Sequence, residues 1–292
     1  MSPIKISGVT VAVFLLALLP GNVMAADAFA AIAPSNTEIG NGLGNTLVLS
    51  APPRGTLDEE TLNYQPIADF LSRVVGKKVV YQHSDNWLSY TKNMTVGKYD
   101  FIYDGPHFNG WRMEKLNHSP LVRFPGDRQF VLITKSDNKA IKEVKQLAGR
   151  RICAHAPPNL GTLIMLNQFD NPARQPLIVE VKGWETSYKE LINGKCVATV
   201  IPLKFKEKLD NKDKNLTQVL YTSKAVPEEA LSAGPRLSPE MQAKLKQALL
   251  SEEGKAATAK LRSAYAGKNF VPATREEYAG LGVYLKDTYS FY

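Results

Sequence analysis

The sequence predicts an α/β protein of two lobes, each a mostly parallel sheet flanked by helices. From residue 46 to about residue 221, short apolar runs rich in β-branched residues alternate with helical patterns, which is typical of βαβ units. A chain of 292 residues exceeds the length at which single cores stop growing. With 44% hydrophobic and 22% charged residues, the composition is that of a globular protein with an ample core.

The first 25 residues predict a signal peptide. Lys5 precedes the apolar run 11–19, and the small-residue pattern Val23-Met24-Ala25 follows, so cleavage is expected after Ala25. The alternative, a membrane anchor, is disfavoured because a spanning helix needs roughly 20 apolar residues. We therefore expect an exported protein without a membrane-spanning segment. Residues 26–45 are small, polar and glycine-rich, which predicts a flexible N-terminus.

The first lobe is expected over residues 46–135. Its first strand is 46–50, and the next helix is expected to begin near Pro66 and to stop at Gly76, because residues 67, 70, 71, 74 and 75 share one apolar face. Further strands are predicted at 78–82, 99–103, 121–124 and 129–134. Helices are predicted near 87–94 and 107–116.

The second lobe is expected over residues 136–214, where the alternation restarts after a polar segment. Its predicted strands are 151–155, 177–181 and 197–201, with helices near 160–169 and 185–193. Residues 215–221 are read as a strand that returns to the first lobe. The segment 215–292 then completes that lobe with C-terminal helices from residue 238 onward.

Ligands of open α/β sheets bind beyond the carboxyl ends of the parallel strands. The segments expected there are 51–54, 83–87, 103–107, 156–162, 182–188 and 202–206, which are aromatic and basic. Helix starts and arginines suit a small anion. The candidate ligand-binding residues are Arg54, Tyr103, Asp104, His107, Asn159, Gly161, Thr162, Trp184 and Tyr188. For Arg54 and Asn159 the alternatives are a solvated loop charge and a helix cap.

Metal binding and catalysis are the other site chemistries to consider. His83, His107 and His155 fall near predicted strand ends, which leaves a metal-binding receptor as an alternative. They lack an HxxxH-type spacing, so we expect no metal and no cofactor. The sequence contains no GxSxG, HExxH or P-loop motif, and no GxGxxG that opens a helix, so we expect no enzyme.

The chain has two cysteines, Cys153 and Cys196. Export makes thiols oxidisable, and the even count predicts a disulfide between them, with two free buried thiols as the alternative. The formal net charge of +8 is compatible with anionic solutes, lipid headgroups or polyanions and does not choose among them.

Three segments occur in the order of a known family. They are 62–71 (LNYQPIADFL) followed by Gly76 and Val79, then 97–106 (GKYDFIYDGP), then 145–152 (KQLAGRRI). They resemble, over roughly residues 46–225, the periplasmic receptors that bind phosphate, phosphite or phosphonate. The resemblance implies a type II periplasmic-binding fold, whose two lobes close around a small ligand and deliver it to an ABC transporter permease.

Two departures from that family leave the ligand class open. The phosphonate binders carry a Ser-Thr-Ser-Gly-like loop where this chain has APPNLGT at 156–162, so only Thr162 and the helix start remain to hold an oxyanion. A G-x-x-D element of the family is replaced by Gly194-Lys195-Cys196. We expect a small anionic, phosphonate- or phosphate-like ligand and no nucleic acid. The alternative partner is a membrane signalling protein, which would make the chain an extracytoplasmic sensor.

Overall fold

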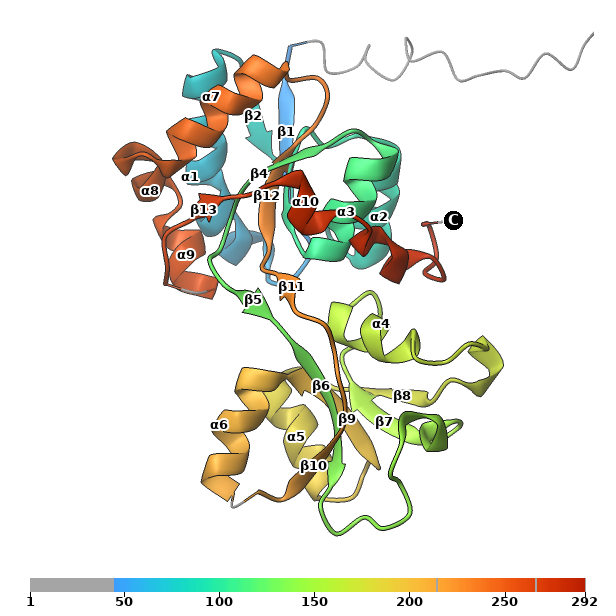
Figure 1. Cartoon of the computed structure of the whole chain (residues 1–292). Helices are drawn as coiled ribbons and strands as arrows, with labels where there is room; N and C mark the ends of the chain where they lie inside the picture. Colours follow the sequence, from blue (N-terminus) through green and yellow to red (C-terminus); the bar gives the residue numbers. More distant parts are fainter. Residues whose placement is uncertain (1–44, 214, 266, 292) are drawn as a thin grey trace, which may run out of the picture. The chain divides into compact units, whose positions relative to one another are not determined.

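The computed structural model describes residues 45–213, 215–265 and 267–291 (Figure 1). The predicted signal peptide at 1–25 and the N-terminal segment up to residue 44 lie outside this part of the chain. Within the described ranges, no helix has both the length and the hydropathy that a bilayer span requires. The described elements form two larger sheets and one short two-stranded ribbon.

The first sheet has six strands in the order β13-β4-β12-β3-β1-β2. Its parallel part consists of β1 (Leu47–Ser50), β2 (Val79–Tyr81) and β3 (Phe101–Asp104). Three strands extend it in antiparallel pairs: β12 (Ala230–Ala233), β4 (Ser119–Arg123) and β13 (Val271–Pro272). The parallel strands therefore end at one edge, where the segments after β1 and β3 can contribute to a common site.

Helices pack on both faces of this sheet, and alternate residues of β1 show the division. Leu47 and Leu49 pack on one face in a core with α1 (Leu57–Val75), α7 (Pro239–Leu250) and α9 (Ala259–Tyr265). The short helix α8 (Glu252–Ala257) lies between α7 and α9 in the chain. Val48 packs in another cluster with α2 (Trp87–Thr95), α3 (Pro106–Lys115) and the 3₁₀ segment η3 (Leu281–Leu285). The short helix α10 (Arg275–Tyr278) lies between β13 and η3 in the chain.

The helix α1 begins nine residues before the predicted start at Pro66. Thr56 accepts from the N–H of Glu59, and the Glu59 side chain accepts from the N–H of Thr56, so the two residues form a capping box. Pro66 lies inside the helix, which ends at Gly76 with a φ of 68°. The capping box, rather than the proline, marks where this helix starts.

The second sheet has five strands in the order β10-β6-β9-β7-β8. The strand β7 (Arg151–Ala154) pairs in parallel with β8 (Leu177–Glu180) and β9 (Ala198–Pro202). The strands β6 (Phe130–Lys135) and β10 (Thr217–Thr222) add antiparallel pairs. Its helices are α4 (Leu160–Leu166), α5 (Trp184–Ile192) and α6 (Leu203–Asp213), with 3₁₀ turns η1 (Val144–Leu147) and η2 (Pro172–Arg174).

Two strands lie in a different sheet from the one predicted. The segments 129–134 and 215–221 were expected in the first lobe, but β6 and β10 belong to the second sheet. The chain crosses between the sheets at β5 (Asp127–Arg128) and β11 (Val226–Pro227), which pair with each other antiparallel. Only Pro125, Gly126, Asp127 and Arg128 separate the predicted strands 121–124 and 129–134. Such a short gap resembles an ordinary hairpin turn, so the local sequence does not indicate a change of sheet.

The predicted disulfide is confirmed. Cys153 on β7 and Cys196 in the turn before β9 are bonded, with their Cα atoms 5.6 Å apart, and both are buried. The bond fixes the turn after α5 to β7, which lies between β9 and β8 in the second sheet. The α/β class is also confirmed, although each sheet is mixed, with its parallel pairs confined to three strands.

Candidate ligand-binding site

A pocket of about 600 Å³ lies among the segments that follow β1, β3, β7 and β8 and the two crossing strands. The sequence rule on strand ends therefore located most of it. Of the nine predicted residues, four line the pocket: Arg54, His107, Asn159 and Trp184. The pocket is also lined by residues that were not in the predicted set, among them Trp87, Phe108, Arg128, Phe130, His155, Glu180, Lys182, Glu228, Glu229 and Tyr265.

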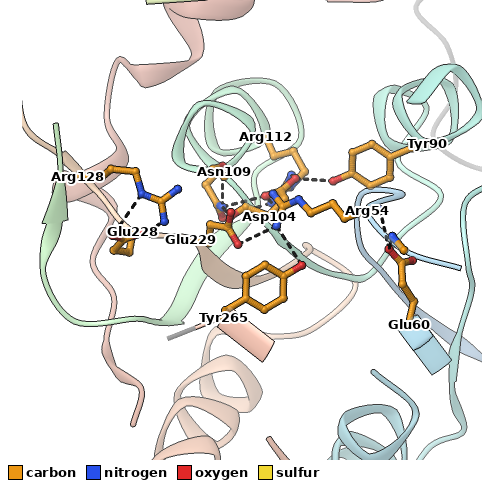
Figure 2. Close-up of polar contacts among 12 residues, drawn as sticks. Arg54, Glu60, Tyr90, Asp104, Asn109, Arg112, Arg128, Glu228, Glu229 and Tyr265 are labelled. Carbon is orange, nitrogen blue, oxygen red and sulfur yellow. Dashed lines mark hydrogen bonds and ion pairs between the residues drawn. The ribbon is translucent and has the colours of Figure 1, made fainter. Parts of the chain in front are cut away.

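Arg54 extends from the loop after β1 into this pocket (Figure 2). Its Nη1 donates to Glu229 Oε2 at 2.8 Å and to the hydroxyl of Tyr265 at 3.3 Å, and its guanidinium lies 5.6 Å from the centre of the Tyr265 ring. The loop is anchored because Glu60 on α1 accepts from the backbone N–H of Arg54 at 2.7 Å. Burial opposes the charge of Arg54, but the nearby carboxylate of Glu229 holds its pKa well above the usual value.

A second arginine reaches the pocket from the crossing strand β5. Arg128 is bidentate to Glu228, which follows β11, the partner of β5. The adjacent Glu228 and Glu229 therefore each hold one arginine, as Figure 2 shows. Burial alone would raise the pKa of Glu229, but the charges of Arg54 and Arg128 lower it.

The start of α3 forms another wall of the pocket. Its N-cap is Gly105, no side chain caps its amino end, and Pro106 is its first residue. The Nε2 atom of His107 lies 3.0 Å from the carbonyl oxygen of Pro158, which only accepts, so Nε2 carries the hydrogen. Burial lowers the pKa of His107 to about 3, so the ring is neutral at physiological pH. The peptide bond between Pro157 and Pro158 is cis.

Asp104 and Tyr103 were predicted to contact ligand, and the structure places both outside the pocket lining. Asp104 is fully buried and accepts from Arg112 Nη2 at 2.8 Å, from the hydroxyl of Tyr90 and from Asn109 Nδ2 at 2.9 Å (Figure 2). This network holds the turn between β3 and α3. Tyr103 is buried among aromatic rings on the opposite side of β3.

The loop 156–162, predicted to hold an oxyanion, satisfies its polar groups internally. The side chain of Asn159 caps α4 by accepting from the N–H of Thr162 at 3.3 Å, and the Thr162 hydroxyl donates to the carbonyl of His155 at 2.6 Å. Gly161 lies against the ring of Phe130, where an added Cβ would be 2.6 Å from a ring carbon. Thr162 and Gly161 are buried and do not line the pocket.

The start of α5 contributes an aromatic platform. Trp184, the first residue of the helix, stacks on His155 with ring centres 4.0 Å apart and planes 3° apart. The N–H of Gly183 donates to His155 Nε2 at 3.1 Å, which fixes the imidazole ring. Burial lowers the pKa of His155, which favours the neutral form of this ring. Tyr188, one turn further along α5, instead donates to Asp210 at 2.8 Å in the core.

The three histidines considered for a metal site do not form one. His83 is paired with Glu60, its Nδ1 lying 2.9 Å from Oε2, whereas His107 and His155 have the separate partners described above. Across residues 45–213, 215–265 and 267–291, no group of three or more His, Cys, Asp or Glu side chains is arranged to hold a metal ion.

Comparison with known proteins points to one family. The model of the periplasmic substrate-binding protein of ABC phosphonate transporters matches residues 49–278. The phosphate-import protein PhnD of Mycolicibacterium smegmatis is 23% identical over 234 residues, which is 70% of this chain and 71% of that protein.

Solved structures agree with this match. XAC2383 from Xanthomonas citri bound to ATP has a TM-score of 0.62 at 13% identity, and PhnD1 from Prochlorococcus marinus in complex with methylphosphonate has 0.55 at 13%. Each comparison covers 82% of this chain and 97% of the other. At these identities the likeness concerns the fold, and it confirms the predicted two-lobed, type II periplasmic-binding architecture.

Proposed function

We propose a ligand and a role from the premise that the chain belongs to the family of periplasmic phosphonate-binding proteins of ABC transporters, whose model matches residues 49–278. Members of this family bind substrate for transport and are not enzymes, so the chain is a solute-binding protein whose partners are a small molecule and a permease. The ligand proposed here carries a phosphonate- or phosphate-like oxyanion. Export after cleavage behind Ala25 belongs to the same proposal.

The observation that carries the proposal is the position of Arg54 beside the uncapped start of α3. Both line the same pocket, and the positive charge of Arg54, although a smaller cause than burial, contributes to the low pKa of His107. Within the described residues only Nη1 of Arg54 is engaged by side chains, so Nε and Nη2 remain as donors. A guanidinium edge and the free N–H groups of a helix start together suit a tetrahedral oxyanion.

The ion pair with Glu229 is compatible with this role. Glu229 binds Arg54 through a single oxygen at 2.8 Å, and it holds the guanidinium in place without occupying its other donors. A pre-positioned arginine loses less side-chain entropy on binding than a freely rotating one. The proposed oxyanion thus adds to the existing contact and need not replace it.

Isothermal titration calorimetry on protein purified from the periplasm tests the proposal. With methylphosphonate and inorganic phosphate as probes, Arg54→Met should weaken binding by about 10- to 100-fold, because a hydrogen bond to a charged group contributes roughly 1.5–3 kcal/mol. The matched control is Arg73→Met on α1, which removes the same charge from an exposed ion pair with Glu253 of α8. Equal affinities for the two variants, or no binding of either anion by the wild type, would overturn the proposal.

The same preparation tests export. The intact mass of the periplasmic protein should correspond to a chain that begins at Ala26. A mass that includes residues 1–25 would contradict the predicted cleavage site.

A further inference from the structure

The pocket is larger than a simple oxyanion requires. Its volume of about 600 Å³ falls in the range of roughly 300–1,000 Å³ that encloses drug-sized ligands. A phosphate or methylphosphonate ion has the bulk of only a few water molecules, each of about 30 Å³. Most of the volume therefore remains to be filled once an oxyanion is bound at Arg54.

One wall of the remaining volume is the stack of His155 and Trp184. The two planes are only 3° from parallel, and the Gly183 N–H prevents the imidazole from turning. The edge of Phe130, 6.2 Å from the indole centre at 61°, supports the stack from the side. His155 and Trp184 are half-buried and line the pocket, so this rigid aromatic surface remains partly exposed to solvent.

A second aromatic pair lines the pocket from the first lobe. Trp87, at the start of α2, stacks with Phe108 on α3 with ring centres 6.1 Å apart and planes 23° apart. Tyr90 meets the Trp87 ring edge-on at 6.0 Å, which holds the indole in place. Trp87 is also half-buried, whereas Phe108 is buried.

Two half-exposed indoles held rigidly at one pocket favour an aromatic partner. Indoles bury a large apolar area when covered, and aromatic rings gain about 0.5–1.5 kcal/mol from stacked or edge-on contact beyond that area. We propose that the ligand is an organophosphonate or phosphate ester bearing an aromatic or heteroaromatic ring, which packs on the His155–Trp184 stack while its oxyanion binds at Arg54. This inference rests on the proposed function, because it takes the oxyanion end as given.

Three phosphonates with the same charged group separate the effect of a ring from that of size. Methylphosphonate, cyclohexylphosphonate and phenylphosphonate are titrated into the full exported protein. Phenylphosphonate should bind the wild type at least 10-fold more tightly than methylphosphonate, and about 2- to 10-fold more tightly than cyclohexylphosphonate, which matches its size but cannot stack.

The variants locate the ring. Trp184→Leu should abolish the preference for phenylphosphonate over cyclohexylphosphonate, and Trp184→Phe should retain part of it. Methylphosphonate binding by these variants checks that the oxyanion end is intact. The control is Tyr289→Leu, which removes a ring that is 71% exposed and lies outside this pocket, and it should leave all three affinities unchanged.

The outcomes distinguish the two levels of the proposal. Two results would refute the aromatic ring of the ligand and leave the oxyanion receptor standing. In the first, methylphosphonate binds and the two larger phosphonates bind no more tightly; in the second, phenyl- and cyclohexylphosphonate bind equally tightly. If the preference for phenylphosphonate survives Trp184→Leu, the assigned stacking surface is wrong. If none of the three binds, the proposed function falls and the ring inference falls with it.

Discussion

Replacing Arg112 with methionine is expected to destabilise the protein by about 3–5 kcal/mol, the usual cost of leaving one partner of a buried ion pair alone. The side chains of Arg112 and Asp104 are both fully buried. Arg112 contributes two charged hydrogen bonds to the carboxylate, one of them at 2.8 Å, and a third at 2.9 Å to Ser232. Methionine fills most of the space of the arginine chain, so the loss reports the uncompensated charge rather than a cavity.

Without Arg112, the neutral donors Tyr90 and Asn109 remain at the Asp104 carboxylate. The double variant Asp104→Leu with Arg112→Met removes both charges, and replacing a buried pair by apolar groups is often nearly neutral. Some loss is expected to remain, because the Tyr90 hydroxyl and Asn109 Oδ1 lose their partners, at about 1–3 kcal/mol for each group left unsatisfied. The double variant should nevertheless be more stable than the sum of the single effects predicts.

Urea-induced unfolding followed by circular dichroism gives the free energy of unfolding of each variant. The control is Arg73→Met, whose ion pair with Glu253 is exposed and should contribute less than about 1 kcal/mol. A loss below about 1 kcal/mol for Arg112→Met would contradict the argument from burial. Strictly additive losses in the double variant would show that Asp104 and Arg112 do not interact energetically.

Three further predictions concern stability. Replacing Cys153 and Cys196 by serine should cost about 4 kcal/mol, because the bond closes a loop with a sequence separation of 43, and an unchanged urea midpoint would contradict this. The free energy of unfolding should fall as the pH drops from about 6.5 towards about 3, because His107 takes up a proton in the unfolded chain that the buried folded ring resists. In urea titrations at several pH values, His107→Gln should flatten this dependence on pH. An unchanged slope would refute the prediction. Gly161→Ala should lower stability by about 1–3 kcal/mol, because the new Cβ would meet the Phe130 ring at 2.6 Å, and an unchanged melting temperature would argue against it.

The fold class and most elements could be predicted because their signals are local. Alternation of apolar runs with helical patterns depends on residues a few positions apart, and that is enough to place β1, β3 and β7. Assigning β6 and β10 to a sheet depends instead on partners far along the chain. Phe130 pairs with Pro202, and Thr217 with Lys135, and no periodicity within either strand specifies those neighbours.

The start of α1 has a signal in the sequence that is more specific than its proline. Thr56 and Glu59 have the spacing of a capping box, and acidic residues follow in the first turn. Pro66 predicts a later start, because proline is common at the first helical position. A proline inside the helix is tolerated here, where nine residues precede it and the long helix is anchored on both sides by buried residues such as Tyr64 and Ile67.

The pocket lies largely at the strand ends that the sequence predicts, whereas the polar side chains predicted at the start of α4 form hydrogen bonds within their own loop and helix. Asn159 and Thr162 carry polar side chains at a helix start, and polar side chains there satisfy the helix itself, which leaves little for a ligand. Gly105 and Gly183 carry none, so the starts of α3 and α5 are not capped by a side chain. Both of these helix starts line the pocket, and no side chain there competes for their backbone N–H groups.

The charged part of the site arises from the crossing strands, which the rule on strand ends does not include. Pairing of β5 with β11 brings Arg128 next to residues about 100 positions later, and Glu228 and Glu229 follow directly. One glutamate holds an arginine from the crossing segment and the other holds Arg54 from the loop after β1. These contacts connect the crossing strands to the loop that extends into the pocket. A ligand bound at Arg54 would therefore contact a side chain that Glu229 links to the point where the chain passes between the two sheets.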